Sequence, residues 1–248
     1  LGYSATYHYT IMKNNPKDPY FKHFVEDIEQ RYHIRVLLVD DYKEIQIILN
    51  ELNSRIRSKR VFVSGAFSSF TSEIEEYSHN LSRNLASSLL ENDYRIVNGI
   101  GRRFGTHLIG YANEYLAKQG VKDIEKHLIV KPFVGNTQAA AEEKYRSRKK
   151  VIGQCGTAIF VFGEMSENSS ATKSGVMEEF EIACEQHKTI IPIAYPGMVS
   201  EIIWEKVKGE LTRYPYLEGR IDLLTSVQSP EFLSQIIIHI LDSVQESM

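Results

Sequence analysis

The stretch Arg60-Val-Phe-Val-Ser64-Gly65-Ala66 is a short β-branched and aromatic run that ends in a glycine turn. A second stretch, Tyr94-Arg-Ile-Val-Asn98-Gly99-Ile-Gly101, repeats this pattern and leads into a helical pattern that starts near Phe104. Runs of this kind, alternating with helical segments, are typical of βα units. The two stretches therefore predict neighbouring strands of a parallel sheet, with a glycine turn at each carboxyl end.

The same alternation extends along the chain and predicts an α/β fold with a mainly parallel sheet. The candidate strands are residues 7–12, 34–39, 60–64, 94–98, 127–133, 157–162 and 189–194. The candidate helices are residues 20–31, 43–56, 77–91, 104–118, 139–152, 176–186, 201–211 and 231–245.

Residues 1–57 contain only two of these strands and two of these helices, too few to bury both faces of a parallel pair. A charged stretch, residues 53–60, then separates this part from the first glycine-turn strand. We therefore expect a domain boundary near Ser58, giving parts 1–58 and 59–248. Because the chain begins at Leu1 and not at Met, we expect a piece of a longer protein.

The composition argues against nucleic-acid-binding and membrane-spanning classes of protein. The 248 residues include 29 Lys and Arg against 32 Asp and Glu, so the net charge of -3 provides no general attraction to nucleic acid or anionic membranes. The longest largely apolar runs, such as residues 34–39 and 236–241, are too short to cross a bilayer. Two cysteines, Cys155 and Cys184, suit a reducing compartment. We expect a cytoplasmic protein with no membrane or nucleic-acid partner and no cofactor.

The sequence also predicts no metal site. Its candidate ligands do not fall at the spacings of common metal motifs, and surface or capping roles are the simpler interpretation for each. These residues are His79, His107, His127 and His187.

The two glycine turns are candidate ligand-binding loops, because open α/β sheets bind ligands beyond the carboxyl ends of their strands. Glycine lets the backbone approach a ligand closely, and the following helix offers unpaired N–H groups to a phosphate. Ordinary turns without a ligand are the alternative. The candidates are Ser64, Gly65, Ala66 and Phe67 in the first loop, and Gly99, Gly101 and Arg102 in the second.

Two charged residues fall against the pattern of their helices. A period of 3.6 residues puts Arg148 on the apolar face of helix 139–152 and Glu179 at the edge of the apolar face of helix 176–186, whereas Glu178 falls on the exposed face. A buried guanidinium needs an anion, either a ligand phosphate or a protein carboxylate. Gly163 ends the strand before the second helix at the same edge of the sheet and is a further candidate ligand-binding residue. Arg148 and Glu179 are therefore predicted to face one pocket there.

The residues around these two charges resemble the SLOG superfamily, the fold of the LOG nucleotide phosphoribohydrolases. The resemblance covers residues 145–152, 155–163, 175–180 and 189–194, with Arg148 and Glu179 in place of the Arg and Glu of the LOG enzymes. The Pro-Gly-Gly turn of those enzymes is replaced by the polar segment 164–173. The resemblance implies a Rossmann-like three-layer fold with a mainly parallel sheet.

Residues 8–11 and 34–39 resemble the end of the sirtuin-like NADase domain in the effector family of the bacterial Thoeris antiphage system, and residues 61–65 resemble the start of its SLOG domain. The resemblance implies a regulatory sensor and not an enzyme. Its ligand would be a cyclic ADP-ribose isomer made by a TIR-domain protein, and binding would activate the NAD+ hydrolase domain of a parent protein. A homo-oligomer, either a dimer or a tetramer, is also implied.

In this interpretation the glycine turns and Arg148 bind a pyrophosphate, and Glu179 accepts hydrogen bonds from ribose hydroxyls. Phe67 and Phe133 stack on the base. Two alternatives remain open. One is a LOG-like nucleoside 5′-monophosphate phosphoribohydrolase in which Arg148 and Glu179 support the reaction. The other is an oligomer-forming scaffold with vestigial glycine loops.

Overall fold

The computed structural model describes residues 8–68, 71–132, 138–165 and 174–247. The chain divides into two compact units, Leu1–Arg55 and Ile56–Met248. Phe133, one of the two aromatic residues expected at the base, lies outside the described residues.

The first unit is a parallel pair of strands with two helices. Strand β1 (His8–Lys13) pairs with β2 (Ile34–Val39) in the register His8 to Ile34, and α1 (Phe21–Tyr32) connects them. Helix α2 (Lys43–Ser58) runs across the division between the units. Within residues 8–55, Val39 is the one side chain classed as buried. Large apolar side chains are exposed instead: Tyr9, Tyr20, Phe24, Tyr32, Leu38, Tyr42, Ile47, Leu49 and Leu52.

The second unit is built on a five-stranded, fully parallel sheet with the strand order β5-β4-β3-β6-β7. Strand β3 is central and pairs with β4 on one side and β6 on the other. The parallel sheet confirms the predicted fold class. The strands are β3 (Arg60–Ser64), β4 (Arg95–Asn98), β5 (Leu128–Val130), β6 (Thr157–Val161) and β7 (Thr189–Ile193).

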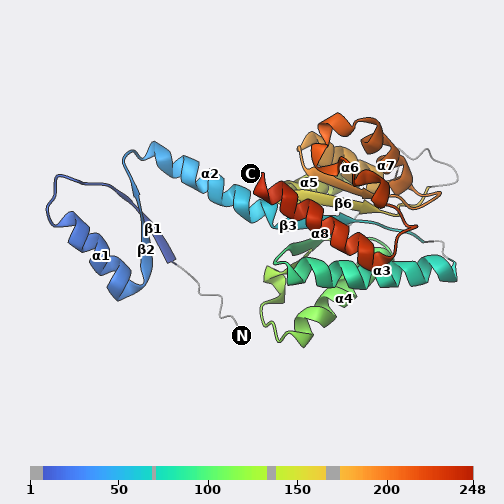
Figure 1. Ribbon diagram of the computed structural model, residues 1–248, viewed down its shortest axis with the longest axis horizontal. Helices are drawn as coiled ribbons and strands as arrows, with labels where there is room; N and C mark the ends of the chain where they lie inside the picture. The colour runs from blue at the N-terminus through green and yellow to red at the C-terminus, as the bar shows by residue number, and fades with distance from the viewer. Residues whose placement is uncertain (1–7, 69–70, 133–137, 166–173, 248) are drawn as a thin grey trace. The chain divides into compact units, whose positions relative to one another are not determined.

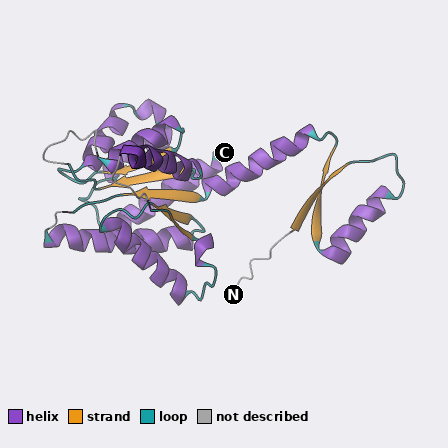
Figure 2. Cartoon of the chain, turned by 180° about the vertical axis from the view of Figure 1, so that it is seen from behind, coloured by secondary structure: helices purple, strands orange, loops and turns teal. Residues whose placement is uncertain are grey.

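Helices cover both faces of this sheet, which gives the three layers visible in Figures 1 and 2. Helices α3 and α4 pack together on one face with α8 against α3, whereas α5, α6 and α7 lie on the other. Every residue of β6 is buried, as expected for a strand covered on both faces. The helices are α3 (Ser72–Glu91), α4 (Phe104–Lys118), α5 (Gln138–Gly153), α6 (Gly175–Glu185), α7 (Val199–Gly209) and α8 (Pro230–Glu246). Short 3-10 turns cover Ile124–Lys126, Leu211–Arg213, Pro215–Leu217 and Ile221–Leu223.

Two elements differ most from the bounds that the sequence predicts. Helix α3 begins at Ser72 instead of residue 77, because the Thr71 side chain caps it by accepting a hydrogen bond from the backbone N–H of Ile74. Strand β5 covers three residues, Leu128–Val130, and so is shorter than the predicted run of 127–133.

The loops after β3, β4 and β6 are joined by backbone contacts. The N–H of Gly163 donates to the carbonyl of Ala66 over 3.0 Å, and the N–H of Phe67 donates to the carbonyl of Arg102 over 3.4 Å. A Cβ atom at Gly101 would lie 2.0 Å from the carbonyl oxygen of Gly65. The two predicted glycine turns therefore touch each other, and this contact leaves no room for a side chain.

We predict that Gly101→Ala destabilises the fold by roughly 1–3 kcal/mol or more, because the added methyl group must push the β3 loop aside. Gly110→Ala is the matched control in the same region: a Cβ at Gly110 of helix α4 meets no atom within 4 Å. Alanine there should stabilise the helix by about 0.5–1 kcal/mol. Urea unfolding of both variants measures the difference. Equal stabilities would contradict the close approach of the two loops.

Candidate functional site

A cavity of about 440 Å³ lies at the carboxyl ends of β3, β4 and β6. This is the switch point of the sheet, because the chain leaves β3 toward β4 but reaches β6 only after forming the far edge strand β5. Helices α5 and α6 complete its wall. The lining residues are Val63, Ser64, Gly65, Ala66, Phe67, Ser68, Asn98, Gly99, Ile100, Gly101, Arg102, Lys144, Arg148, Glu164, Ser174, Gly175, Val176 and Glu179.

Arg148 and Glu179 meet in this wall, as the sequence predicted. Both residues are 8% exposed, and the Arg148 Nε donates to Glu179 Oε1 over 3.0 Å. The other carboxylate oxygen, Glu179 Oε2, accepts a hydrogen bond of 2.5 Å from the Ser64 hydroxyl. The carboxylate therefore joins α5, α6 and the end of β3.

Glu178 also contacts Arg148, which corrects the expectation that it faces solvent. Its Oε2 is paired with the Arg148 Nη1, and its side chain is 33% exposed. The guanidinium lies directly against the first turn of α6, where a Cβ at Gly175 would be 2.7 Å from Arg148 Nη2. Arg148 of the neighbouring helix α5 thus pairs with both acidic side chains in that turn. A helical wheel of α6 alone does not show this contact.

Burial changes the electrostatics of the cavity wall. It raises the pKa of the Glu179 carboxyl, and Arg148 and the Ser64 hydroxyl oppose that shift by stabilising the charged form. Burial also lowers the pKa of Lys144, and the nearby positive charge of Arg148 lowers it further. Three basic side chains line the cavity: Lys144, Arg148 and the exposed Arg102.

The loop after β4 is held in an unusual conformation. Asn98 is 1% exposed; its side chain donates to the carbonyl of Val63 over 2.8 Å and accepts from the N–H of Ile100 over 2.7 Å. Ile100 and Arg103 have positive φ angles of 57° and 56°, which side chains rarely adopt and which are most costly for a β-branched residue. Such strain clusters at ligand sites, where the surrounding structure maintains it.

Most of the predicted site residues line this one cavity, but Phe67 and Gly163 differ from the expectation. Phe67 borders the cavity, yet it is 1% exposed and its ring packs on Phe162 with centroids 5.1 Å apart, so it is not free to stack on a base. Gly163 does not line the cavity; its φ of 93° and its two backbone hydrogen bonds shape the turn after β6. Phe133 is outside the described residues.

A family model described as the Sir2- and TIR-associating SLOG family, STALD, matches residues 44–244. The chain belongs to the STALD family. The match covers most of the chain and includes the whole sheet of the second unit. The parallel sheet with its switch-point cavity is the STALD part of this protein.

Curated relatives share the name NAD(+) hydrolase ThsA. The protein of Bacillus cereus (strain MSX-D12) is 30% identical over 215 residues, which cover 85% of this chain and 44% of the relative. That of Enterococcus faecium is 30% identical over 191 residues, covering 74% and 38%, and that of Acinetobacter baumannii (strain 532279) is 26% identical over 194 residues, covering 74% and 40%. The chain spans less than half the length of these relatives.

Five polar residues that line the cavity are not among the predicted site residues: Lys144, Asn98, Glu164, Ser68 and Ser174. Lys144 precedes Arg148 by one helical turn, and this i, i+4 spacing places both on the same face of α5. Asn98 is a polar residue at the end of a buried strand, a position where open α/β sheets bind ligands. Both signals were available in the sequence. Glu164 and Ser68, which are hydrogen-bonded across the cavity rim, lie in loops where no periodic pattern exists.

We predict that Arg148→Ala destabilises the protein by about 3–5 kcal/mol, because it leaves the buried Glu179 without its cation. Lys149→Ala is the matched control, since the neighbouring Lys149–Glu185 pair joins the same two helices at 3.3 Å but is about half exposed. It should cost no more than about 1 kcal/mol. Urea unfolding at about pH 7 compares the two variants.

The pH dependence is a second readout of the same change. Without Arg148, burial should raise the pKa of Glu179 further, so the folded variant retains a proton that the unfolded chain releases. The deficit of Arg148→Ala should therefore be smaller at about pH 5 than at about pH 8. A deficit that is independent of pH would show that the lost interaction is not with this carboxylate.

Proposed function

We propose that this chain is the nucleotide-sensing part of a ThsA-like protein and binds a cyclic ADP-ribose isomer in the switch-point cavity. The signal would come from a TIR-domain protein, and binding would activate a sirtuin-like NAD+ hydrolase domain of the parent protein in antiphage defence. The chain itself would bind without cleaving. The observation that carries the proposal is the cavity, in which the start of α6 and three basic side chains surround a buried carboxylate.

The pyrophosphate of such a ligand suits the positive side of the cavity. The first residues of α6 line it, and the loop 99–102 that lines it leads into α4. Helix N-termini offer N–H groups and a partial positive charge to anions. Lys144 and Arg102 add full charges at the same place. Cations at the cavity attract a doubly charged ligand although the chain as a whole is slightly acidic.

The ribose and the base need different partners. Carboxylates accept hydrogen bonds from sugar hydroxyls, and both Glu179 and Glu164 line the cavity. Ile100 also lines it and is 45% exposed, so it offers an apolar surface to a base. A volume of about 440 Å³ is within the range of sites for small ligands.

Residues 1–58 are proposed to be the end of the sirtuin-like domain. The support is the large number of exposed apolar side chains in the first unit, because an isolated domain rarely leaves so many uncovered. Regulation requires that the ligand favour one arrangement of domains or subunits over another. We propose that it acts through a cytoplasmic homo-oligomer, either a dimer or a tetramer. Among the described residues, no helix is both long and apolar enough to cross a membrane.

Calorimetry with a panel of cyclic ADP-ribose isomers, linear ADP-ribose and AMP tests the proposal. Lys144→Ala should weaken binding of the preferred cyclic isomer roughly tenfold, because it removes a charge-assisted contact to phosphate. Lys150→Ala, on the exposed side of the same helix, should bind like the wild type. Equal affinity of Lys144→Ala and the wild type would refute the placement of the pyrophosphate, and no binding of any cyclic isomer would refute the proposed ligand.

The alternative is hydrolysis of a nucleoside 5′-monophosphate, and the Arg148–Glu179 pair is the observation that favours it. Incubation with AMP separates the two functions. Release of free adenine by the wild type, lost in Glu179→Gln, would support the enzyme. Tight binding of a cyclic isomer with no release of base would support the sensor.

A further inference from the structure

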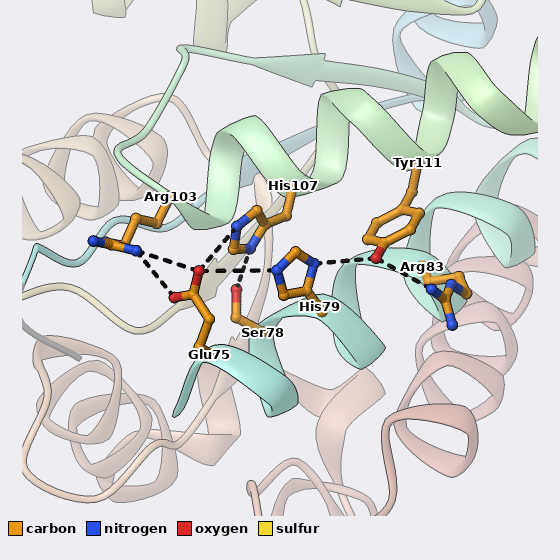
Figure 3. A network of polar contacts seen from close by, with 7 residues as sticks. All are labelled: Glu75, Ser78, His79, Arg83, Arg103, His107 and Tyr111. Atoms are coloured by element: carbon orange, nitrogen blue, oxygen red, sulfur yellow. Dashed lines mark hydrogen bonds and ion pairs between the residues drawn. The ribbon is translucent and has the colours of Figure 1, made fainter. Parts of the chain in front are cut away.

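A second polar cluster lies on the opposite face of the sheet from Arg148, between α3 and α4 (Figure 3). Glu75 and His79 are one turn apart on α3, and His107 faces them from α4. Glu75 Oε1 is 3.8 Å from His79 Nε2 and 3.5 Å from His107 Nε2. The three ligand-type atoms all lie within 4.8 Å of one another. Histidines that the sequence placed at the surface or in caps are thus gathered around one carboxylate oxygen.

The Nδ1 atom of each imidazole has a hydroxyl partner of its own. His107 Nδ1 lies 3.0 Å from the Ser78 hydroxyl, and His79 Nδ1 lies 3.1 Å from the Tyr111 hydroxyl. Figure 3 shows both Nε2 atoms directed toward Glu75, away from these partners. In metal sites a histidine that binds through one nitrogen usually donates a hydrogen bond through the other, which fixes the ring. Ser78 and Tyr111 occupy these positions here.

The donor set suits a zinc-like cation. Two imidazoles and one carboxylate are a known ligand combination for Zn²⁺, with bond lengths of about 2.0–2.2 Å. Tetrahedral coordination at those lengths separates ligand atoms by about 3.3 Å, slightly less than the two Glu75 distances. The rings are stacked with centroids 3.8 Å apart and planes inclined by 21°, so binding requires side-chain rotations that unstack the rings and turn both Nε2 atoms onto one point.

Arg103 competes with a bound cation for the Glu75 carboxylate. Its Nη1 lies 3.2 Å from Glu75 Oε1 and 3.3 Å from Oε2. A cation bound by Glu75 must therefore displace this guanidinium or share the carboxylate with it. Removal of the Arg103 charge should strengthen metal binding, an effect that a purely structural histidine pair would not show.

We propose that Glu75, His79 and His107 form a binding site for one divalent transition-metal ion of the zinc class, joining α3 to α4. Hard cations such as Mg²⁺ prefer oxygen ligands and should not bind there. The site is separate from the proposed nucleotide cavity, and the proposal does not depend on what that cavity binds.

The test uses the full chain, stripped of metal with a chelator and titrated with ZnCl₂ in a calorimeter, with visible absorption of Co²⁺ as a second probe. One Zn²⁺ per chain should bind, and a hundredfold excess over Kd should raise the Tm by roughly 5–10 °C. His79→Ala and Glu75→Gln should each weaken binding at least roughly tenfold. His239→Ala, an exposed histidine on α8, is the matched control and should bind like the wild type.

Two further variants make the result decisive. The His79 side chain is 42% exposed whereas that of His107 is 14% exposed, so His79→Ala should disturb the fold less. If His107→Ala fails to fold, His79→Ala still tests the site. Arg103→Gln should bind Zn²⁺ more tightly than the wild type. Saturable binding that persists unchanged in His79→Ala, or the absence of binding to the wild type, would overturn the proposed site. Unchanged or weaker binding by Arg103→Gln would overturn the role of Glu75 as a ligand.

Discussion

The arrangement of the cavity depends on the buried contact between Arg148 and Glu179. Each residue comes from a different helix, and the Ser64 hydroxyl ties their carboxylate to the central strand. Removing two charges from water costs several kcal/mol per ion, and well-packed apolar residues of similar size are often as stable or more so. Stability alone therefore does not account for the pair. Its effect is positional, because it holds a guanidinium and a carboxylate at the carboxyl ends of the strands, the edge at which open α/β sheets generally bind ligands.

The fold could be predicted from short apolar runs because its strands are buried on both faces and need no alternating pattern. Strand β6 was predicted within one residue for this reason. The first residues of helices are harder to predict, since a single capping side chain can determine where a helix begins. The Thr71 cap extends α3 to Ser72, five residues before the apolar pattern indicates, and that first turn contains Glu75. The missing turn concealed the pairing of Glu75 with His79.

Helical periodicity predicted the buried position of Arg148 because a charge inside an apolar stripe is visible from one helix alone. It was wrong for Glu178, because the cation that holds this residue arrives from α5. The contacts of His107 with Glu75 and Ser78 likewise join two different helices, α4 and α3. Periodicity states which face of a helix is covered, but the partner comes from the topology. Side chains shared between helices are therefore the part of a site that a single sequence conceals.

The loop between β4 and α4 belongs to both clusters. Arg102 lines the cavity, while the adjacent Arg103, held at a positive φ, is hydrogen-bonded to Glu75. A ligand that changes this loop changes how strongly Arg103 holds Glu75, and a cation that takes Glu75 releases the loop from one of its contacts. By linkage, any effect of the cation on nucleotide affinity must equal the effect of the nucleotide on cation affinity. The strained loop thus contacts both the cavity and the Glu75 cluster.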